Sequence, residues 1–73
     1  MHHQMTQTMA NRLYEEMRKK GLSSNDMCKI LNVKYPAYIN AVQGKAQFFG
    51  KWQKKICEAL DVEREVLFKE FYQ

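Results

Sequence analysis

The chain has 73 residues, of which 45% are hydrophobic, and a formal net charge of +4. This length allows one domain with a modest core, and no segment reaches the roughly 18 consecutive apolar residues that a membrane span requires. We therefore expect a single functional module without a membrane span. Because the first residues lack the apolar core of a signal peptide, we expect a cytoplasmic protein.

We expect residues 1–5 to form a flexible N-terminal tail and residues 6–73 to form a single domain. Thr6 or Thr8 can cap a first helix, since apolar residues recur after them at helical spacing. Three consecutive basic residues and Gly21 then favour the end of that helix, because cations suit a helix C-terminus and glycine suits the position just beyond it.

A second helix is predicted at about residues 23–31 and a third at about residues 36–43. Ser23 and Asp26 have the spacing of a capping box at the start of the second helix. Asn32 tolerates the left-handed conformation of a tight turn, and Pro36 fits the first turn of the third helix, which should stop at Gly44.

Two further helices complete the chain, one carrying Phe49 and Trp52 on its apolar stripe and a last one carrying Val66 and Phe71. Strand-like alternation is absent, so the sequence predicts an all-α fold, a compact bundle of about five short helices. The expected core consists of Leu13, Met17, Leu22, Met27, Ile30, Leu31, Val33, Tyr38, Ala41, Trp52, Ile56, Leu60, Val62 and Leu67.

The composition argues against catalysis and against a metal site or cofactor. Cys28 and Cys57 lie in apolar helical segments without a second ligand at suitable spacing, so both are predicted to be small buried hydrophobic residues. His2 and His3 fall in the predicted tail, and no helix places paired carboxylates beside a nucleophile. We expect neither an enzyme nor a small-molecule substrate.

The charge is unevenly distributed along the chain. Residues 17–55 contain nine basic side chains and a single acidic one, Asp26, whereas residues 56–73 contain two basic and five acidic ones. A basic centre indicates a surface for a polyanion and a different role for the acidic end. The alternative is that these lysines lie on solvated helix faces.

The segment from Leu22 to Phe68 has the order of features of a known DNA-binding family. The order begins with a Leu-Ser opening, Met27 and Cys28, Leu31, a turn residue and Val33. The third helix, Gly44-Lys45 and the run Ile56–Val62 come after these. This spacing resembles the phage lambda repressor and Cro-like helix-turn-helix family. The resemblance implies a helix-turn-helix domain whose third helix is the recognition helix in the major groove of DNA.

The resemblance also implies roles for individual residues. Those expected to face bases are Tyr35, Pro36, Ala37 and Asn40, with Asn40 the best candidate because its amide can pair with adenine through two hydrogen bonds. Those expected to contact phosphates are Ser23, Ser24, Lys34, Gln43, Lys45, Gln47 and Lys51.

These features predict a sequence-specific duplex DNA-binding regulator of transcription, a repressor of phage or mobile-element type. Aromatic residues beyond the needs of one small core suggest a homodimer interface formed by Phe68, Phe71 and Tyr72. The alternative is a helix-turn-helix-like module that binds a protein, as an antitoxin or anti-repressor partner. Its support is the apolar pair Ile39 and Val42 and the apparently exposed aromatics Phe48, Phe68, Phe71 and Tyr72.

Overall fold

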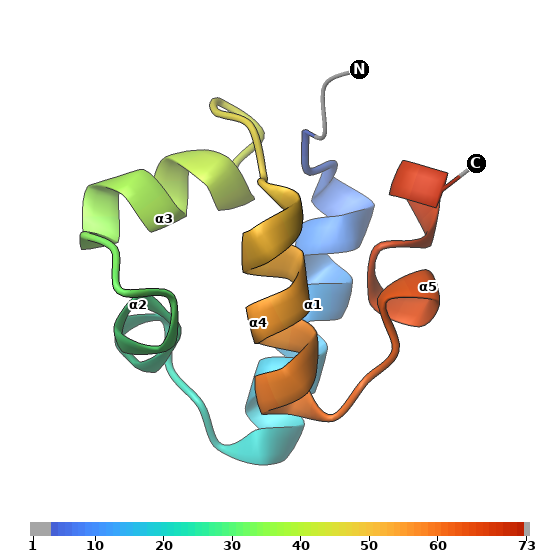
Figure 1. Ribbon diagram of the computed structural model, residues 1–73, viewed down its shortest axis with the longest axis horizontal. Helices are drawn as coiled ribbons and strands as arrows, with labels where there is room; N and C mark the ends of the chain where they lie inside the picture. The colour runs from blue at the N-terminus through green and yellow to red at the C-terminus, as the bar shows by residue number, and fades with distance from the viewer. Residues whose placement is uncertain (1–3, 73) are drawn as a thin grey trace.

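The computed structural model describes residues 4–72, with side chains through residue 71. Over this range it contains only helices: α1 (Gln7–Lys20), α2 (Ser24–Leu31), α3 (Tyr35–Val42), α4 (Gly50–Leu60), α5 (Arg64–Leu67) and the 3₁₀ helix η1 (Lys69–Tyr72). Figure 1 shows α1 and α4 in the middle of the molecule, α2 and α3 on one side, and α5 with the C-terminal turn on the other. The predicted all-α bundle is confirmed.

The first two helices begin at side-chain caps. The Thr6 hydroxyl accepts a hydrogen bond from the Met9 amide at 3.2 Å. At the start of α2, the Ser23 hydroxyl accepts from the Asp26 amide, and the Asp26 carboxylate accepts from the Ser23 amide, which completes the predicted capping box. These bonds satisfy amides that a helix start leaves without partners.

Three helices end with the same motif, in which a residue in the left-handed conformation is followed by an apolar residue. The pairs are Gly21-Leu22 after α1, Asn32-Val33 after α2 and Asp61-Val62 after α4. In each pair the amide of the apolar residue donates to a carbonyl five residues earlier, at 2.9 to 3.1 Å, and its side chain packs against the core. The turns are therefore fastened both by hydrogen bonds and by apolar burial.

The end of α3 keeps this hydrogen bond but changes the side chain. Gly44 has φ +79°, and the Lys45 amide donates to the Asn40 carbonyl at 2.9 Å. Lys45 is exposed, whereas the corresponding apolar residues after the other helices are half-buried. The segment after α3 thus presents a cation to solvent where the other turns face inward.

The core contains most of the expected residues, although four of them lie at its edge. Leu22, Ile30, Val33 and Val62 are half-buried and pack against it. The additional buried apolar residues are Met5, Met9, Ala10, Cys28, Val42, Phe48, Cys57 and Phe68. Within residues 4–72, no helix is long and apolar enough to cross a membrane.

Three sequence predictions about apolar side chains are wrong. Phe48 occupies the core in place of Phe49, which is 45% exposed at the start of α4. Val66 is also exposed, because α5 is a single short turn that buries only Leu67. The predicted tail ends earlier than residue 5, since Met5 is buried, while residues 1–3 lie outside the described part of the chain.

Candidate nucleic-acid interface

Helices α2 and α3 form a corner joined by a short turn. Figure 1 views α2 along its axis while α3 lies across the picture, so the two helices cross at a steep angle. Asn32 makes this turn possible with φ +57°, and Val33 anchors it on the core. Asparagine is one of the few residues other than glycine that adopt this conformation readily, so the turn has the predicted chemistry.

The inner face of α3 fixes that helix on the core. Tyr38 and Ala41 are fully buried and Val42 is 2% exposed. The Tyr38 hydroxyl donates to the Met17 sulfur in α1 at 3.6 Å, and burial raises the pKa of Tyr38. These contacts prevent α3 from rotating about its axis and therefore determine which side chains face solvent.

The outer face of α3 carries the predicted base-facing residues. Pro36, Ala37, Asn40 and Gln43 recur at helical spacing, and all four are exposed. Tyr35 begins the helix with 51% of its surface exposed. Asn40 therefore stands in the middle of a solvent-facing stripe, with small side chains before it and Gln43 after it.

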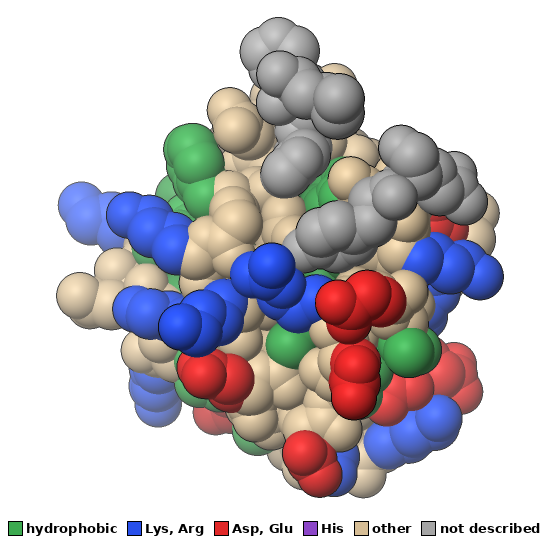
Figure 2. Space-filling view, turned by 45° about the vertical axis from the view of Figure 1, so that its right-hand side comes forward, with side chains coloured by type: hydrophobic (Ala, Val, Ile, Leu, Met, Phe, Trp, Pro, Cys, Tyr) green, Lys and Arg blue, Asp and Glu red, His purple; other side chains and the backbone are tan. Residues whose placement is uncertain are grey.

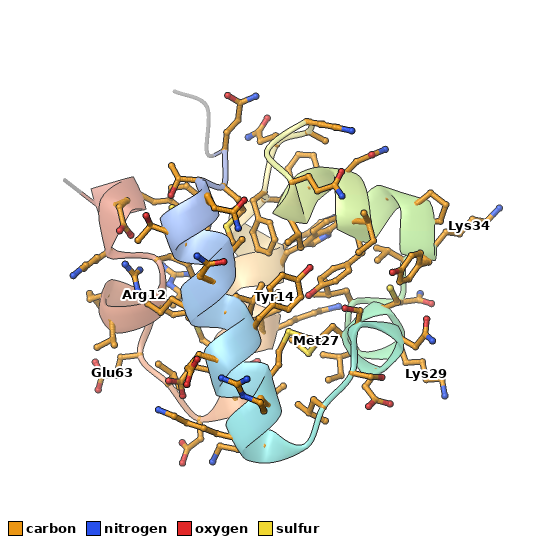
Figure 3. The ribbon with its side chains drawn as sticks, turned by 180° about the vertical axis from the view of Figure 1, so that it is seen from behind. Arg12, Tyr14, Met27, Lys29, Lys34 and Glu63 are labelled. Carbon is orange, nitrogen blue, oxygen red and sulfur yellow. The ribbon has the colours of Figure 1, made fainter. Side chains whose placement is uncertain are left out.

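Lysines lie on both sides of this stripe. Lys34 precedes α3, Lys45 follows it, and Lys51 lies in the first turn of α4; all three are exposed, as is Gln47. In Figure 3, Lys34 and Lys29 extend outward from the corner of α2 and α3. The predicted phosphate contacts beyond the start of α2 are thus exposed and lie before and after the predicted base-facing residues along the chain.

The lysines of this region form no ion pair among the described residues, although the charge of Lys29 contributes to lowering the pKa of Asp26. We define the lysine segment as residues 27–57, which contain six lysines and no aspartate or glutamate: Lys29, Lys34, Lys45, Lys51, Lys54 and Lys55. Within residues 4–71, the ion pairs join Arg12 to Glu70, Arg18 to Glu15 and Lys19 to Glu16, and none involves the lysine segment. In Figure 2, basic side chains gather on the left and toward the centre, and the right and lower parts carry both acidic and basic side chains.

The start of α2 is less suited to phosphate than predicted. The Ser23 hydroxyl donates to the Asp26 carboxylate at 3.0 Å and also accepts the Asp26 amide, so it is already engaged. These Ser23 bonds lower the pKa of Asp26 and keep its carboxylate charged. A negative charge beside Ser23 and half-buried Ser24 opposes a second anion there.

The starts of α3 and α4 differ from those of α1 and α2. Neither Lys34 nor Phe49, the residues at the two cap positions, makes a side-chain cap hydrogen bond. Neither first turn contains an acidic residue. The lysines near these two helix starts therefore add to the positive end of each helix dipole, which favours anions.

The charges on α4 run against the helix dipole. Lys51, Lys54 and Lys55 lie in its first half, Glu58 follows, and Asp61 ends it. A helix is stabilised by acids near its start and by bases near its end, so this order costs stability.

Two features of this region had no signal in the sequence analysis. Gln53 is 1% exposed and donates to the Phe48 carbonyl at 3.0 Å, which holds the loop before α4. A Cβ added at Gly44 would lie 2.6 Å from the Met5 carbonyl oxygen, so the N-terminal segment packs directly on the loop after α3. A polar residue inside an apolar stripe and a glycine at a helix end are each common without such roles.

The structure contradicts part of the predicted dimer and protein-partner surfaces. Phe48 and Phe68 are fully buried and Val42 nearly so, and Ile39 is half-buried against the core. Phe68 cannot serve as an interface residue because it packs against Phe48 with ring centroids 5.4 Å apart. Phe71 is half-buried, and the Tyr72 side chain lies outside the described residues.

The two cysteines are free and buried, as predicted. Burial raises the pKa of Cys28, and it raises the pKa of Cys57 to about 11, so both thiols stay protonated near neutral pH. Among residues 4–72, no group of three or more His, Cys, Asp or Glu side chains is placed to hold a metal ion.

Neither a known protein-family model nor a curated protein matches this chain.

Proposed function

We propose that this chain is a sequence-specific duplex DNA-binding regulator of the helix-turn-helix kind, with α3 as its recognition helix. The observation that carries the proposal is the exposed α3 stripe around Asn40, flanked along the chain by lysines that form no ion pair within residues 4–71. A binding site for a polyanion requires cations that no internal carboxylate neutralises.

The dimensions of α3 support this role. An α-helix with its side chains is about 10 to 12 Å across, so α3 fits the major groove of B-DNA, which is roughly 12 Å wide. Its small outer residues, Pro36 and Ala37, allow close approach to base edges, and Asn40 then lies within the stripe that meets them. Lys34 at one end and Lys45 at the other are suited to phosphates on either side of the groove.

The chemistry of recognition divides between these groups. Asn40 can donate to adenine N7 and accept from its N6 amino group, which discriminates one base from the others. Lysines bind phosphates regardless of sequence and release counterions, so they supply affinity. Bound at a promoter, a domain of this size would repress by excluding polymerase, and a role on genomic DNA of a bacterium or phage places it in the cytoplasm.

The resemblance to the lambda repressor and Cro-like family remains part of this proposal. The protein-partner alternative is less well supported, since three of its apolar residues, Val42, Phe48 and Phe68, are buried. For a homodimer, the exposed Val66 and the half-buried Phe71 are the remaining apolar candidates at the C-terminal end. Sedimentation equilibrium tests this arrangement, because a monomer mass at every concentration contradicts it.

Selection of bound sequences from a random duplex pool tests the main proposal. We expect one enriched site, on which Asn40→Ala loses about 1 to 3 kcal/mol of binding free energy while losing little on random duplex. Asn11→Ala, which removes an exposed asparagine on α1, is the matched control and should bind both duplexes as the wild type does. Failure to enrich any sequence, or equal losses of Asn40→Ala on both duplexes, contradicts base reading by Asn40.

A further inference from the structure

Phe49 is an exposed aromatic residue at a position where local rules favour neither exposure nor phenylalanine. It is 45% exposed, whereas Phe48 and Phe68 are fully buried and Phe71 is half-buried. It also occupies the cap position of α4, where serine, threonine, aspartate or asparagine would stabilise the helix. Phe49 therefore stands at a cap position without supplying a cap hydrogen bond.

The ring of Phe49 packs against a neighbouring aromatic side chain, Trp52. Trp52 contacts it edge to face, with centroids 5.6 Å apart and an interplanar angle of 73°. Trp52 is itself 9% exposed and packs against buried Phe48 at 5.8 Å. Because Phe49 rests on an ordered aromatic cluster, binding a ligand there would cost little side-chain entropy.

The surroundings of Phe49 are cationic. Lys45 precedes it in the same loop and Lys51 follows it in the first turn of α4, and both are exposed and without acidic partners in the part of the chain described here. An apolar partner surface would bring no charge to these two lysines. The sugar-phosphate backbone of DNA offers both features, an apolar deoxyribose face between two phosphates.

We propose that Phe49 packs on a deoxyribose of the duplex backbone, between the phosphates that Lys45 and Lys51 contact. The inference rests on the proposed function and adds an uncharged contact to it. Phe49 then contributes affinity by removing apolar surface from water, and this contribution, unlike that of the lysines, does not depend on counterion release.

Titration of a short random-sequence duplex at several salt concentrations tests this proposal, with Phe49→Ala as the variant and Phe49→Tyr as its matched control. We expect Phe49→Ala to weaken binding about five- to tenfold at every salt concentration, with the salt slope unchanged, because only apolar contact is lost. Phe49→Tyr keeps the ring and should bind as the wild type does. The single tryptophan, Trp52, should change its fluorescence when the duplex binds.

The outcomes separate this proposal from the one on which it rests. If the wild type binds duplex and Phe49→Ala binds equally well, the Phe49 contact is wrong while the DNA-binding function stands. A changed salt slope in Phe49→Ala also overturns it, since an apolar contact releases no counterions. If the wild type binds no duplex, both proposals fail. Urea unfolding of both variants shows whether Phe49→Ala remains folded under the binding conditions.

Discussion

Two groups of cations in this protein treat charge in different ways. On α1, Arg12, Arg18 and Lys19 each form an ion pair with a carboxylate. In the lysine segment, residues 27–57, the six lysines have no such partner among residues 4–71. In the first group, the pair of Arg12 and Glu70 joins two elements and the other two pairs lie within α1, whereas the second group leaves charge available to a ligand.

The strongest pair of the first group shows what charge does there. Both terminal nitrogens of Arg12 donate to the Glu70 carboxylate, at 2.9 and 2.7 Å, and one of them also donates to the Leu67 carbonyl at 2.8 Å. Figure 3 shows Arg12 on the side of α1 away from Lys29 and Lys34. The pair fastens the C-terminal turn to α1, and no comparable fastening uses the lysines.

The largest expected effect comes from Gly44, where the N-terminal segment touches the lysine segment. Gly44→Ala should lower the free energy of unfolding by about 2 to 4 kcal/mol, because alanine is strained at φ +79° and its Cβ would clash with the Met5 backbone. Urea unfolding measures this. Gly21→Ala, with φ +70° but open space, should lose about 1 kcal/mol, and Gly50→Ala should lose nothing. Equal losses for all three would contradict the close contact.

Arg12→Ala should lower the free energy of unfolding by about 2 kcal/mol, because it removes the paired contacts to Glu70 and Leu67. A double-mutant cycle with Glu70→Gln should give a coupling energy of about 1 kcal/mol. Arg18→Ala is the matched control, since its pair with Glu15 is largely exposed, and we expect a loss below about 0.5 kcal/mol. Duplex affinity should stay unchanged in all these variants. A loss of affinity in folded Arg12→Ala would contradict the separation between ion pairs that serve the fold and lysines that serve binding.

The same pair should make stability depend on acidity. The hydrogen bonds from Arg12 lower the pKa of Glu70 from 4.5 to about 2. The charged carboxylate therefore stabilises the fold above pH 4.5, and this stabilisation disappears as the pH falls from 4.5 toward 2. We expect about 1 to 2 kcal/mol, because the pair is partly open to water. Urea unfolding at a series of pH values should show a shallower acid loss for Glu70→Gln than for the wild type.

The smallest effect should have the opposite sign. Lys51→Glu places an acid in the first turn of α4, so it should raise the free energy of unfolding by about 0.5 kcal/mol while weakening duplex binding. Lys19→Glu, on the last turn of α1, should instead lower stability slightly and leave binding unchanged. A destabilised Lys51→Glu variant would mean that Lys51 already serves the fold.

The sequence predicted the helices well because their signals are local. The capping pair Ser23 and Asp26, the turn at Asn32 and the helix start near Pro36 each depend on residues within one helical turn. The choice between Phe48 and Phe49 depends instead on how the loop before α4 enters the core, and the Gln53 hydrogen bond to Phe48 that fixes it joins a side chain to a backbone carbonyl five residues away. Periodicity alone cannot decide which of two adjacent aromatics turns inward.

The candidate site shows the same limit. The family resemblance implies the roles of Asn40 and Lys45, and both residues are exposed. The spacing of Ser23 and Asp26 predicts a capping box. That this box makes Ser23 a poor phosphate contact follows only from the structure, where the Ser23 hydroxyl is hydrogen-bonded to Asp26. The burial of Phe68 depends on packing between the C-terminal segment and the start of α4, which lie far apart in the sequence.

The salt dependence of duplex binding tests most directly the claim that the lysine segment is left unpaired for a polyanion. The logarithm of the binding constant should fall linearly with the logarithm of salt concentration, with a slope of about −0.9 for each phosphate contacted. Lys45→Gln and Lys51→Gln should each make the slope shallower by about 1, whereas Lys19→Gln should leave it unchanged. A wild-type slope near zero, or the same change in slope for Lys19→Gln as for Lys45→Gln, would contradict the account.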